Sequence, residues 1–338
     1  MAIVAGPAAA QEPINLKGKM ISMIVGSPAG GGTDATGRLI APFLARYLPG
    51  NPTMIVRNVP GADGVVAFNY FVQQAKPDGL TVIAGGGPDI DPLRYRVPQA
   101  HYDPVKFEYV GGAGRGGTTM VIRSGALRRL HDTAAPPVTM GIVAAIPRSG
   151  ELIAAWGIGF LGWHAKWITG YPGTNALMLA LQQGEIDMTA TANLFSLREP
   201  IANGSIKVLV QSGTLQDGRI VPRPEFADVP LLSDALADRM NDPIAVKSFN
   251  YWRAVTLVDK FLALPPGTPA PVVEAYRKAY REIAADPQFT ALGRKISEVF
   301  TPLSDRDVTS QVEAVAATPP DAIAYLDTLL RRQGLSGL

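Results

Sequence analysis

Short apolar runs alternate with amphipathic stretches along the first quarter of the chain. Residues 20–25, 54–56 and 80–84 are compact apolar runs bounded by Gly and Pro, which is typical of buried parallel strands. Between them, residues 34–47 and 65–75 place their apolar side chains on one helical face. The order strand, helix, strand, helix, strand predicts a right-handed, mainly parallel α/β sheet.

The second part of the chain repeats this pattern with different residues. Residues 151–168 are predicted to form one buried helix and residues 176–183 another, and the strongly helical stretches 271–285 and 320–332 follow later. The strand-like runs in this part are 119–122, 138–143, 186–190 and 208–211. The pattern therefore predicts two α/β halves joined edge to edge.

The composition removes several classes of function. The 338 residues include no cysteine, which excludes disulfides, thiol nucleophiles and thiolate metal sites. The three histidines, His101, His131 and His164, are scattered, so we expect no metal site and no catalytic residues. The formal net charge of +2 gives no basic surface for a nucleic-acid partner.

The first residues favour export from the cytoplasm. Residues 8–10 are three alanines that fit a small-residue cleavage site, although the apolar stretch before them is too short for a complete signal peptide. We interpret residues 1–13 as the flexible remnant of a truncated signal peptide, with a mobile Ala-rich terminus as the alternative. The longest later apolar run, 152–163, is shorter than the roughly 20 residues of a membrane span, so we expect a soluble, periplasmic protein.

A glycine-rich loop between the first strand and the first helix carries the most chemistry. Consecutive glycines let a ligand approach the main chain, and the helix beyond them offers unpaired N–H groups and a partial positive charge. Thr33 and Asp34 are also good N-cap residues. The loop therefore suits a small anion such as a carboxylate or phosphate. The candidate ligand-binding residues in it are Ala29, Gly30, Gly31, Gly32, Thr33 and Asp34.

Two other interpretations of this loop stay open at this point. The glycines can simply form a tight turn. The spacing Gly30-x-Gly32-x-x-Ala35 also fits a relaxed dinucleotide fingerprint, which would make the protein an NAD(P)-dependent oxidoreductase. However, the second strand ends in Arg57-Asn58, where such enzymes place an acidic residue for the ribose.

Several segments, in order along the chain, resemble the signature sequences of one family. The matching segments are 28–34 (PAGGGTD) with Arg38, 56–64 (VRNVPGADG), 75–81 (AKPDGLT), 171–174 (YPGT), 184–188 (GEIDM) and 264–273 (LPPGTPAPVV). In this ordered combination the chain resembles the Bug family, the periplasmic solute receptors of tripartite tricarboxylate transporters.

The resemblance implies a two-lobed, type II-like periplasmic binding protein, a Venus flytrap whose mainly parallel sheets are flanked by helices. It implies binding of a small organic mono- or dicarboxylate between the lobes, without cofactor or bond chemistry, and delivery to a membrane permease by a monomer. We expect lobe 1 to hold 14–118 and 245–338, and lobe 2 to hold 119–244. Crossovers near 116–118 and 249–253 would then act as hinges. A surface sensor that is not tied to transport remains an alternative.

Further loops should face the cleft in such a protein. Gly86, Gly87 and Pro88 follow the third strand. Arg148 and Ser149 precede a helix of the other lobe, and an inward-pointing Arg148 can pair bidentately with a carboxylate. The remaining candidates are Tyr171, Thr191 and Asn193.

Family members often carry an aspartate near Thr191 and Asn193, so this chain favours a simple acid over an amine-bearing one. Asp89 and Asp91 are too few for a metal site, and we interpret them as solvated loop charges. Trp156, Trp163 and Trp167 are interpreted as packing residues.

Overall fold

The computed structural model describes residues 14–143, 145–147, 150–192, 194, 197–216 and 219–335. Its first sheet has six strands in the order β13-β4-β12-β3-β1-β2. These strands are β1 (Met20–Val25), β2 (Thr53–Asn58), β3 (Thr81–Gly86), β4 (Glu108–Gly114), β12 (Lys260–Leu264) and β13 (Thr301–Ser304). β1 runs parallel to β2 and β3, whereas β12 and β13 pair antiparallel to their neighbours.

The second sheet has five strands in the order β7-β6-β8-β5-β9. Its strands are β5 (Thr119–Arg123), β6 (Val138–Gly141), β7 (Ala165–Ile168), β8 (Met188–Thr191) and β9 (Ile206–Gln211), and a separate hairpin joins β10 (Thr214–Gln216) to β11 (Arg219–Val221). β6 is parallel to β7 and β8, and β5 is antiparallel to β8 and β9. The expected α/β architecture is present, but both sheets are mixed: β12 and β13 in the first sheet and β5 in the second run opposite to the strands with which they pair.

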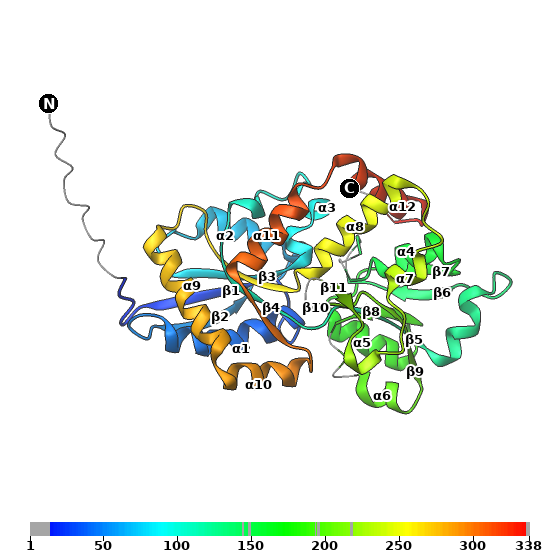
Figure 1. The fold of residues 1–338 in the computed structure, drawn as a ribbon, viewed down its shortest axis with the longest axis horizontal. Coiled ribbons are helices and arrows are strands. Elements are labelled where there is room, and N and C mark those ends of the chain that lie inside the picture. The colour runs from blue at the N-terminus through cyan, green and yellow to red at the C-terminus, as the bar shows by residue number, and fades with distance from the viewer. Residues whose placement is uncertain are drawn as a thin grey trace.

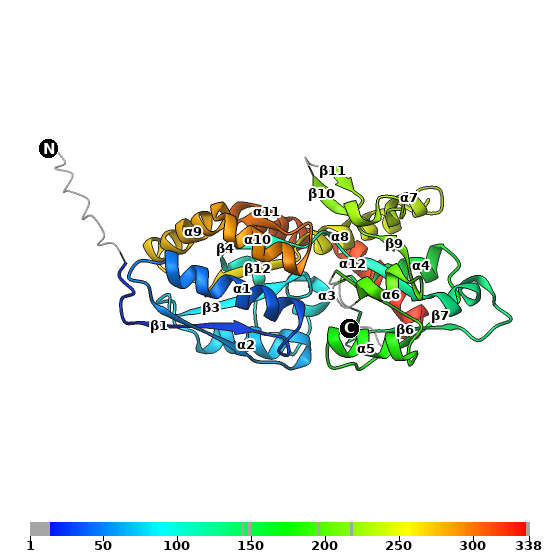
Figure 2. The ribbon, with the colours of Figure 1, turned by 90° about the horizontal axis from the view of Figure 1, so that it is seen from below.

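Helices cover both faces of the sheets, and the two halves lie side by side (Figures 1 and 2). The helices of the first half are α1 (Gly32–Tyr47), α2 (Val65–Gln74), α3 (Pro92–Tyr95), α9 (Ala270–Ala285), α10 (Pro287–Ile296) and α11 (Asp305–Ala316). Those of the second half are α4 (Ile153–Phe160), α5 (Thr174–Gln183), α6 (Arg198–Ala202) and α7 (Leu232–Leu236). α8 (Pro243–Leu257) and α12 (Pro320–Arg332) complete the set. No helix among the described residues is long and apolar enough to cross a bilayer.

Several helices begin with the same local signal. α3, α8 and α10 each start at an Asp-Pro pair, where the aspartate accepts a hydrogen bond from the backbone two residues on and the proline occupies the first helical position. A proline at this position costs no backbone hydrogen bond, because the first N–H groups of a helix have no acceptor within the helix. The sequence thus fixes these helix starts locally, independently of packing.

Each face of the first sheet has its own apolar core. One core joins α1, α9 and α10, with Phe43, Tyr276 and Phe289 among its buried members. The other packs α2 and α11 against the sheet and continues into the second half, where it includes Trp156 and Trp252. The long helix α8 contributes to this shared core, which joins the two halves.

Three details differ from the sequence-based expectation. The predicted helix 151–168 is the short helix α4 followed by strand β7, because Gly162 adopts φ +68° and breaks the helix. Trp163 and Trp167 therefore lie outside that helix, although both are at least partly buried against the core. The expected hinge at 249–253 lies inside α8, and the chain re-enters the first sheet only at Lys260.

Segments of the C-terminal part of the chain pack on different halves. β12 and β13 complete the first sheet. α12, however, packs on α8 and α4, and the Gln333 side chain donates a hydrogen bond to the Ala155 carbonyl at 2.8 Å. The lobe boundaries 14–118 with 245–338, and 119–244, stay a prediction.

Candidate functional site

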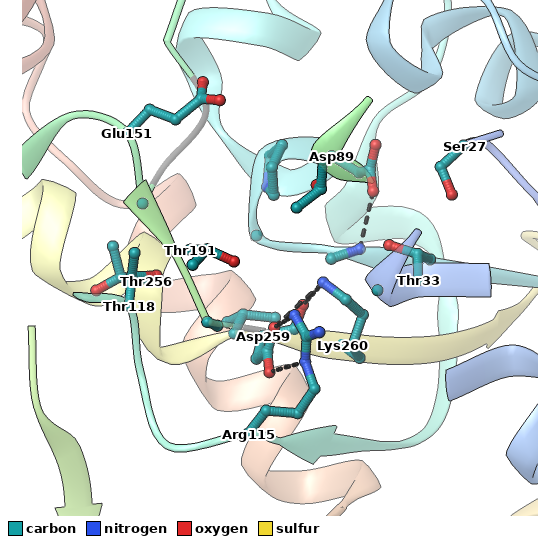
Figure 3. Close-up of a pocket in the computed structure, with 18 of the residues that line it drawn as sticks. Ser27, Thr33, Asp89, Arg115, Thr118, Glu151, Thr191, Thr256, Asp259 and Lys260 are labelled. Atoms are coloured by element: carbon teal, nitrogen blue, oxygen red, sulfur yellow. Dashed lines mark hydrogen bonds and ion pairs between the residues drawn. The ribbon is translucent and has the colours of Figure 1, made fainter. Parts of the chain in front are cut away.

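A cleft lies between the two halves, where the carboxyl ends of β1, β3 and β8 meet. Ligands of open α/β sheets bind at such strand ends. Its cavity of about 150 Å³ suits a solute of a few carbon atoms, whereas drug-sized ligands occupy roughly 300 Å³ or more. The described polar side chains around it are Ser27, Thr33, Asp63, Asp89, Arg115, Thr118, Glu151, Thr174, Thr191, Thr256, Asp259 and Lys260 (Figure 3).

The amino end of α1 forms one wall of this cleft. Gly32 and Thr33 line it, and no side chain caps the helix at Gly31. The first N–H groups of α1 are therefore not capped by a side chain, and a helix amino end of this kind attracts anions. Ala29 and Gly31 line a neighbouring depression, and Gly30, at φ +82°, makes the turn.

Asp34 holds the loop in place. Its carboxylate accepts hydrogen bonds from the Gly30 N–H at 2.8 Å, from Asn58 at 2.8 Å and from Arg38 at 3.0 Å. Burial alone would raise the pKa of Asp34, but these hydrogen bonds hold it below its usual range. Asn58, which stands where a dinucleotide enzyme needs an acid, is thus occupied in tethering the loop.

A second helix start faces the first. Thr174, the first residue of α5, lines the same cleft from the second half, after Gly173. The Asn175 side chain donates a hydrogen bond to the Gly30 carbonyl at 3.3 Å and so links the two loops. Two helix amino ends therefore converge on one space, and their partial positive charges add. Sequence analysis missed Thr174, although its Gly-Thr helix start was a usable signal.

A charged trio forms the floor of the cleft. Arg115 donates two hydrogen bonds of 2.7 Å to the Asp259 carboxylate. Lys260 forms an ion pair with the same carboxylate at 3.2 Å and donates a hydrogen bond to the Asp259 carbonyl at 2.7 Å. Burial would raise the pKa of Asp259, but the two cations hold it well below its usual range. The trio carries a net positive charge, and it faces the amino end of α1.

The position of Arg115 also explains why residue 32 of the loop is a glycine. A Cβ atom at Gly32 would lie 2.3 Å from Arg115 Nη1, so the guanidinium packs directly on the first turn of α1. Nε and Nη2 bind Asp259, whereas Nη1 lies against Gly32. Sequence analysis missed this residue, because β4 and β12 bring together positions that are 144 residues apart.

The acidic loop residues are not solvated, contrary to the expectation. Asp91 is buried and accepts hydrogen bonds from the Leu93 N–H and the Tyr251 hydroxyl. Asp89, in the short helix η2 (Gly87–Ile90), lines the cleft and accepts a hydrogen bond from the Gly86 N–H at 2.8 Å. Burial raises the pKa of Asp89 to about 7, with a further rise from nearby Asp63. The expectation was wrong because the segment that follows β3 runs between the two halves and does not lie on the surface.

The structure brings some of the remaining candidates together and separates others. Gly86, Gly87 and Pro88 line the cleft, as does Thr191 at the end of β8. Tyr171 lies in a neighbouring depression, where its hydroxyl donates a hydrogen bond to Glu185 at 2.6 Å. Burial, together with this contact, raises the pKa of Tyr171 to about 12. The other candidates, Arg148, Ser149 and Asn193, lie outside the described residues.

Comparison with known proteins places this geometry in a structural family. The structure of the periplasmic binding protein BugD matches with a TM-score of 0.68, at 19% sequence identity, over 94% of this chain and 98% of that one. Rpa4515 of R. palustris, solved with adipate, matches with a TM-score of 0.70, at 20% identity, over 94% and 98%. This chain has the fold of a Bug solute-binding protein. The fold that the motif-based resemblance to the Bug family implied is confirmed.

Sequence comparison agrees with the Bug fold. A UPF0065 protein of Bordetella bronchiseptica is 26% identical over 275 residues, which cover 79% of this chain and 73% of that protein. No protein-family profile matches the chain. The Bug fold also confirms the expected fold class, two helix-flanked sheets around a central cleft.

Proposed function

We propose that the protein is an extracytoplasmic receptor that binds a small organic mono- or dicarboxylate in the cleft between its halves. The convergence of two helix amino ends on the Arg115–Asp259–Lys260 trio carries this proposal. Backbone N–H groups and a guanidinium nitrogen that meet in one small space are the donors a carboxylate prefers.

Named relatives support the same chemistry. Rpa4515, which shares the fold, was solved with adipate, a dicarboxylate. In our proposal the carboxylate lies against Gly32, Thr33 and Thr174, within reach of Arg115 Nη1. The remaining wall consists of Gly86, Gly87, Pro88 and Thr191. Of the other candidates, Arg148, Ser149 and Asn193 are kept as expectations from the sequence.

The receptor works by closing around its solute. We infer that lobe 1 and lobe 2 rotate about the crossover at Gly116–Thr118 and the return at 257–260. The consecutive glycines Gly116 and Gly117, at φ +89° and +79°, give the first crossover a conformation that other residues rarely adopt. Binding favours the closed form because only there do both halves contact the acid. Delivery to a tripartite permease, a periplasmic location and a monomeric state complete the proposal.

A ligand panel tests this function. Purified protein is titrated by calorimetry and thermal shift with acetate, propanoate, succinate, adipate, malate and amino acids, and with NAD(H) and NADP(H) as the rival class. We expect stabilisation by an organic acid and none by the dinucleotides. If a dinucleotide binds and no organic acid does, the receptor function is wrong and an oxidoreductase is favoured.

A further inference from the structure

The charges of the cleft are separated into two regions. In Figure 3 the Arg115–Asp259–Lys260 trio lies at the lower side of the cleft, and Asp89 and Ser27 are both drawn above it. Asp63 also lines the cleft, but its carboxylate is paired with Arg94. After these pairings the trio retains a positive charge. Two other acidic residues line the cleft: Asp89 from the first half, and Glu151 from the second half, whose carboxylate accepts a hydrogen bond from the Val143 N–H at 3.2 Å.

The two carboxylate oxygens of Asp89 have different surroundings. Its Oδ2 accepts the hydrogen bond from the Gly86 N–H, whereas Oδ1 lies 2.6 Å from where a Cβ atom of Gly64 would be. Among the described residues, Asp89 forms no ion pair. The positive charges of Lys260 and Arg94 lower the pKa of Asp89 from a longer distance, whereas the negative charge of Asp63 raises it. A half-buried carboxylate with this environment lacks a cation at close range.

A second polar group in the same wall also lacks a partner. The Ser27 hydroxyl oxygen is buried and forms no hydrogen bond among the described residues. Ser27 lines the cleft on the side of Asp89. Buried polar atoms without a partner are rare, and a bound ligand is one of the ways in which they become satisfied.

We propose that the solute is an amino-bearing acid, whose carboxylate binds the trio and helix ends while its ammonium group binds Asp89 and Ser27. The inference rests on the proposed receptor function and refines its ligand class. A second carboxylate at Asp89 would meet a like charge or require that residue to stay protonated, whereas an ammonium group supplies the missing cation. The absence of an acid at Thr191 therefore does not exclude an amine, because Asp89 supplies one from another loop.

Matched pairs of acids test the inference directly. Calorimetry compares 3-aminopropanoate with propanoate, 4-aminobutanoate with butanoate, L-aspartate with succinate and L-glutamate with glutarate. We expect the amino member of the best-binding pair to bind at least tenfold more tightly. Asp89→Asn should abolish this preference by weakening the binding of the amino member, while the acid without an amine should lose no affinity. Asp238→Asn, which removes an exposed charge elsewhere, should change neither affinity.

The outcomes separate the inference from the proposed function. If acids without an amine bind as tightly as their partners, the inference is wrong and the receptor stands. If no acid of either kind binds, both fail. The preference should also weaken as the pH falls from 8 to 5.5, because protonation of Asp89 removes its charge. The ligand pairs on the unaltered protein decide the matter even if Asp89→Asn folds poorly.

Discussion

The two walls of the cleft are built from different chemistry. The wall from the first half carries Asp63, Asp89, Arg115, Asp259 and Lys260, most of the charged groups among the described lining residues. The wall from the second half is formed mainly by threonines and small apolar residues, with Glu151 as its described charged member. We infer that the first wall holds the solute and the second wall covers it.

The walls also differ in how their polar groups are fixed. Arg115 is held by two short hydrogen bonds to Asp259 within a buried ion pair. The link across the cleft from Asn175 to Gly30 is a single, longer hydrogen bond at an exposed position. Rigid charged groups bind with little entropy loss, whereas a weak closing contact lets the halves separate for release. Variants on the two walls should therefore differ in the size of their effects.

The largest effect is expected from Arg115→Met. Breaking a buried ion pair leaves Asp259 with Lys260 alone, which should lower the free energy of unfolding by about 3–5 kcal/mol. Acid binding should fall by roughly 100-fold, since a charge-assisted hydrogen bond is lost. Urea unfolding and calorimetry measure both. Arg115→Lys is the matched control and should lie between, because it keeps the charge without the bidentate geometry. Unchanged acid binding in Arg115→Met would show that the first wall does not hold the acid through Arg115.

The next effect concerns pH and Asp89. Its folded-state pKa of about 7 lies above the ordinary value of 3.8, so the folded protein binds an extra proton between these values. Stability from this group is present below pH 4 and is lost as the pH rises to 7. Asp89→Asn should therefore be more stable than the unaltered protein above pH 7, by on the order of 3 kcal/mol, with little difference at pH 4. Urea unfolding from pH 4 to 8 shows this, and a constant difference over that range would contradict it.

A pair of glycine variants isolates the first turn of α1. Gly32→Ala places a methyl group 2.3 Å from Arg115 Nη1 and should weaken acid binding about tenfold, with a stability loss of about 1–3 kcal/mol. Gly31→Ala meets neighbours only at 3.5 and 3.6 Å, with φ −72°, and should fold normally. Binding curves and thermal melts of the two variants compare them, and equal behaviour would show that Arg115 does not pack there in solution.

The smallest effect is expected on the second wall. Asn175→Ala removes the 3.3 Å hydrogen bond to Gly30 and should weaken acid binding only about threefold, without a measurable change in stability. Calorimetry gives the affinity, and small-angle scattering with and without the acid reports closure. A loss as large as that of Arg115→Met would show that the second wall holds the solute as firmly as the first.

Local patterns predicted much of the architecture. Apolar runs gave β1, β2 and β3, and the amphipathic face of residues 34–47 gave α1, because these features depend on neighbouring residues. The prediction failed at 151–168, where uniformly apolar residues hide the change from helix to strand at Gly162. A continuous apolar run fits a buried helix and a buried strand equally well.

Local sequence features set the glycine-rich start of α1 and the alternation of strands and helices, and they include the motifs that resemble the Bug family. These are short-range features, set by backbone freedom, capping and periodicity. Which charged side chains come into contact depends on the three-dimensional arrangement of the strands. Arg115 reaches Asp259 and Lys260 because β12 inserts beside β4, and Asp89 turns inward because η2 follows β3 into the cleft. Electrostatic partners depend on distance in space, which strand order fixes and local sequence does not.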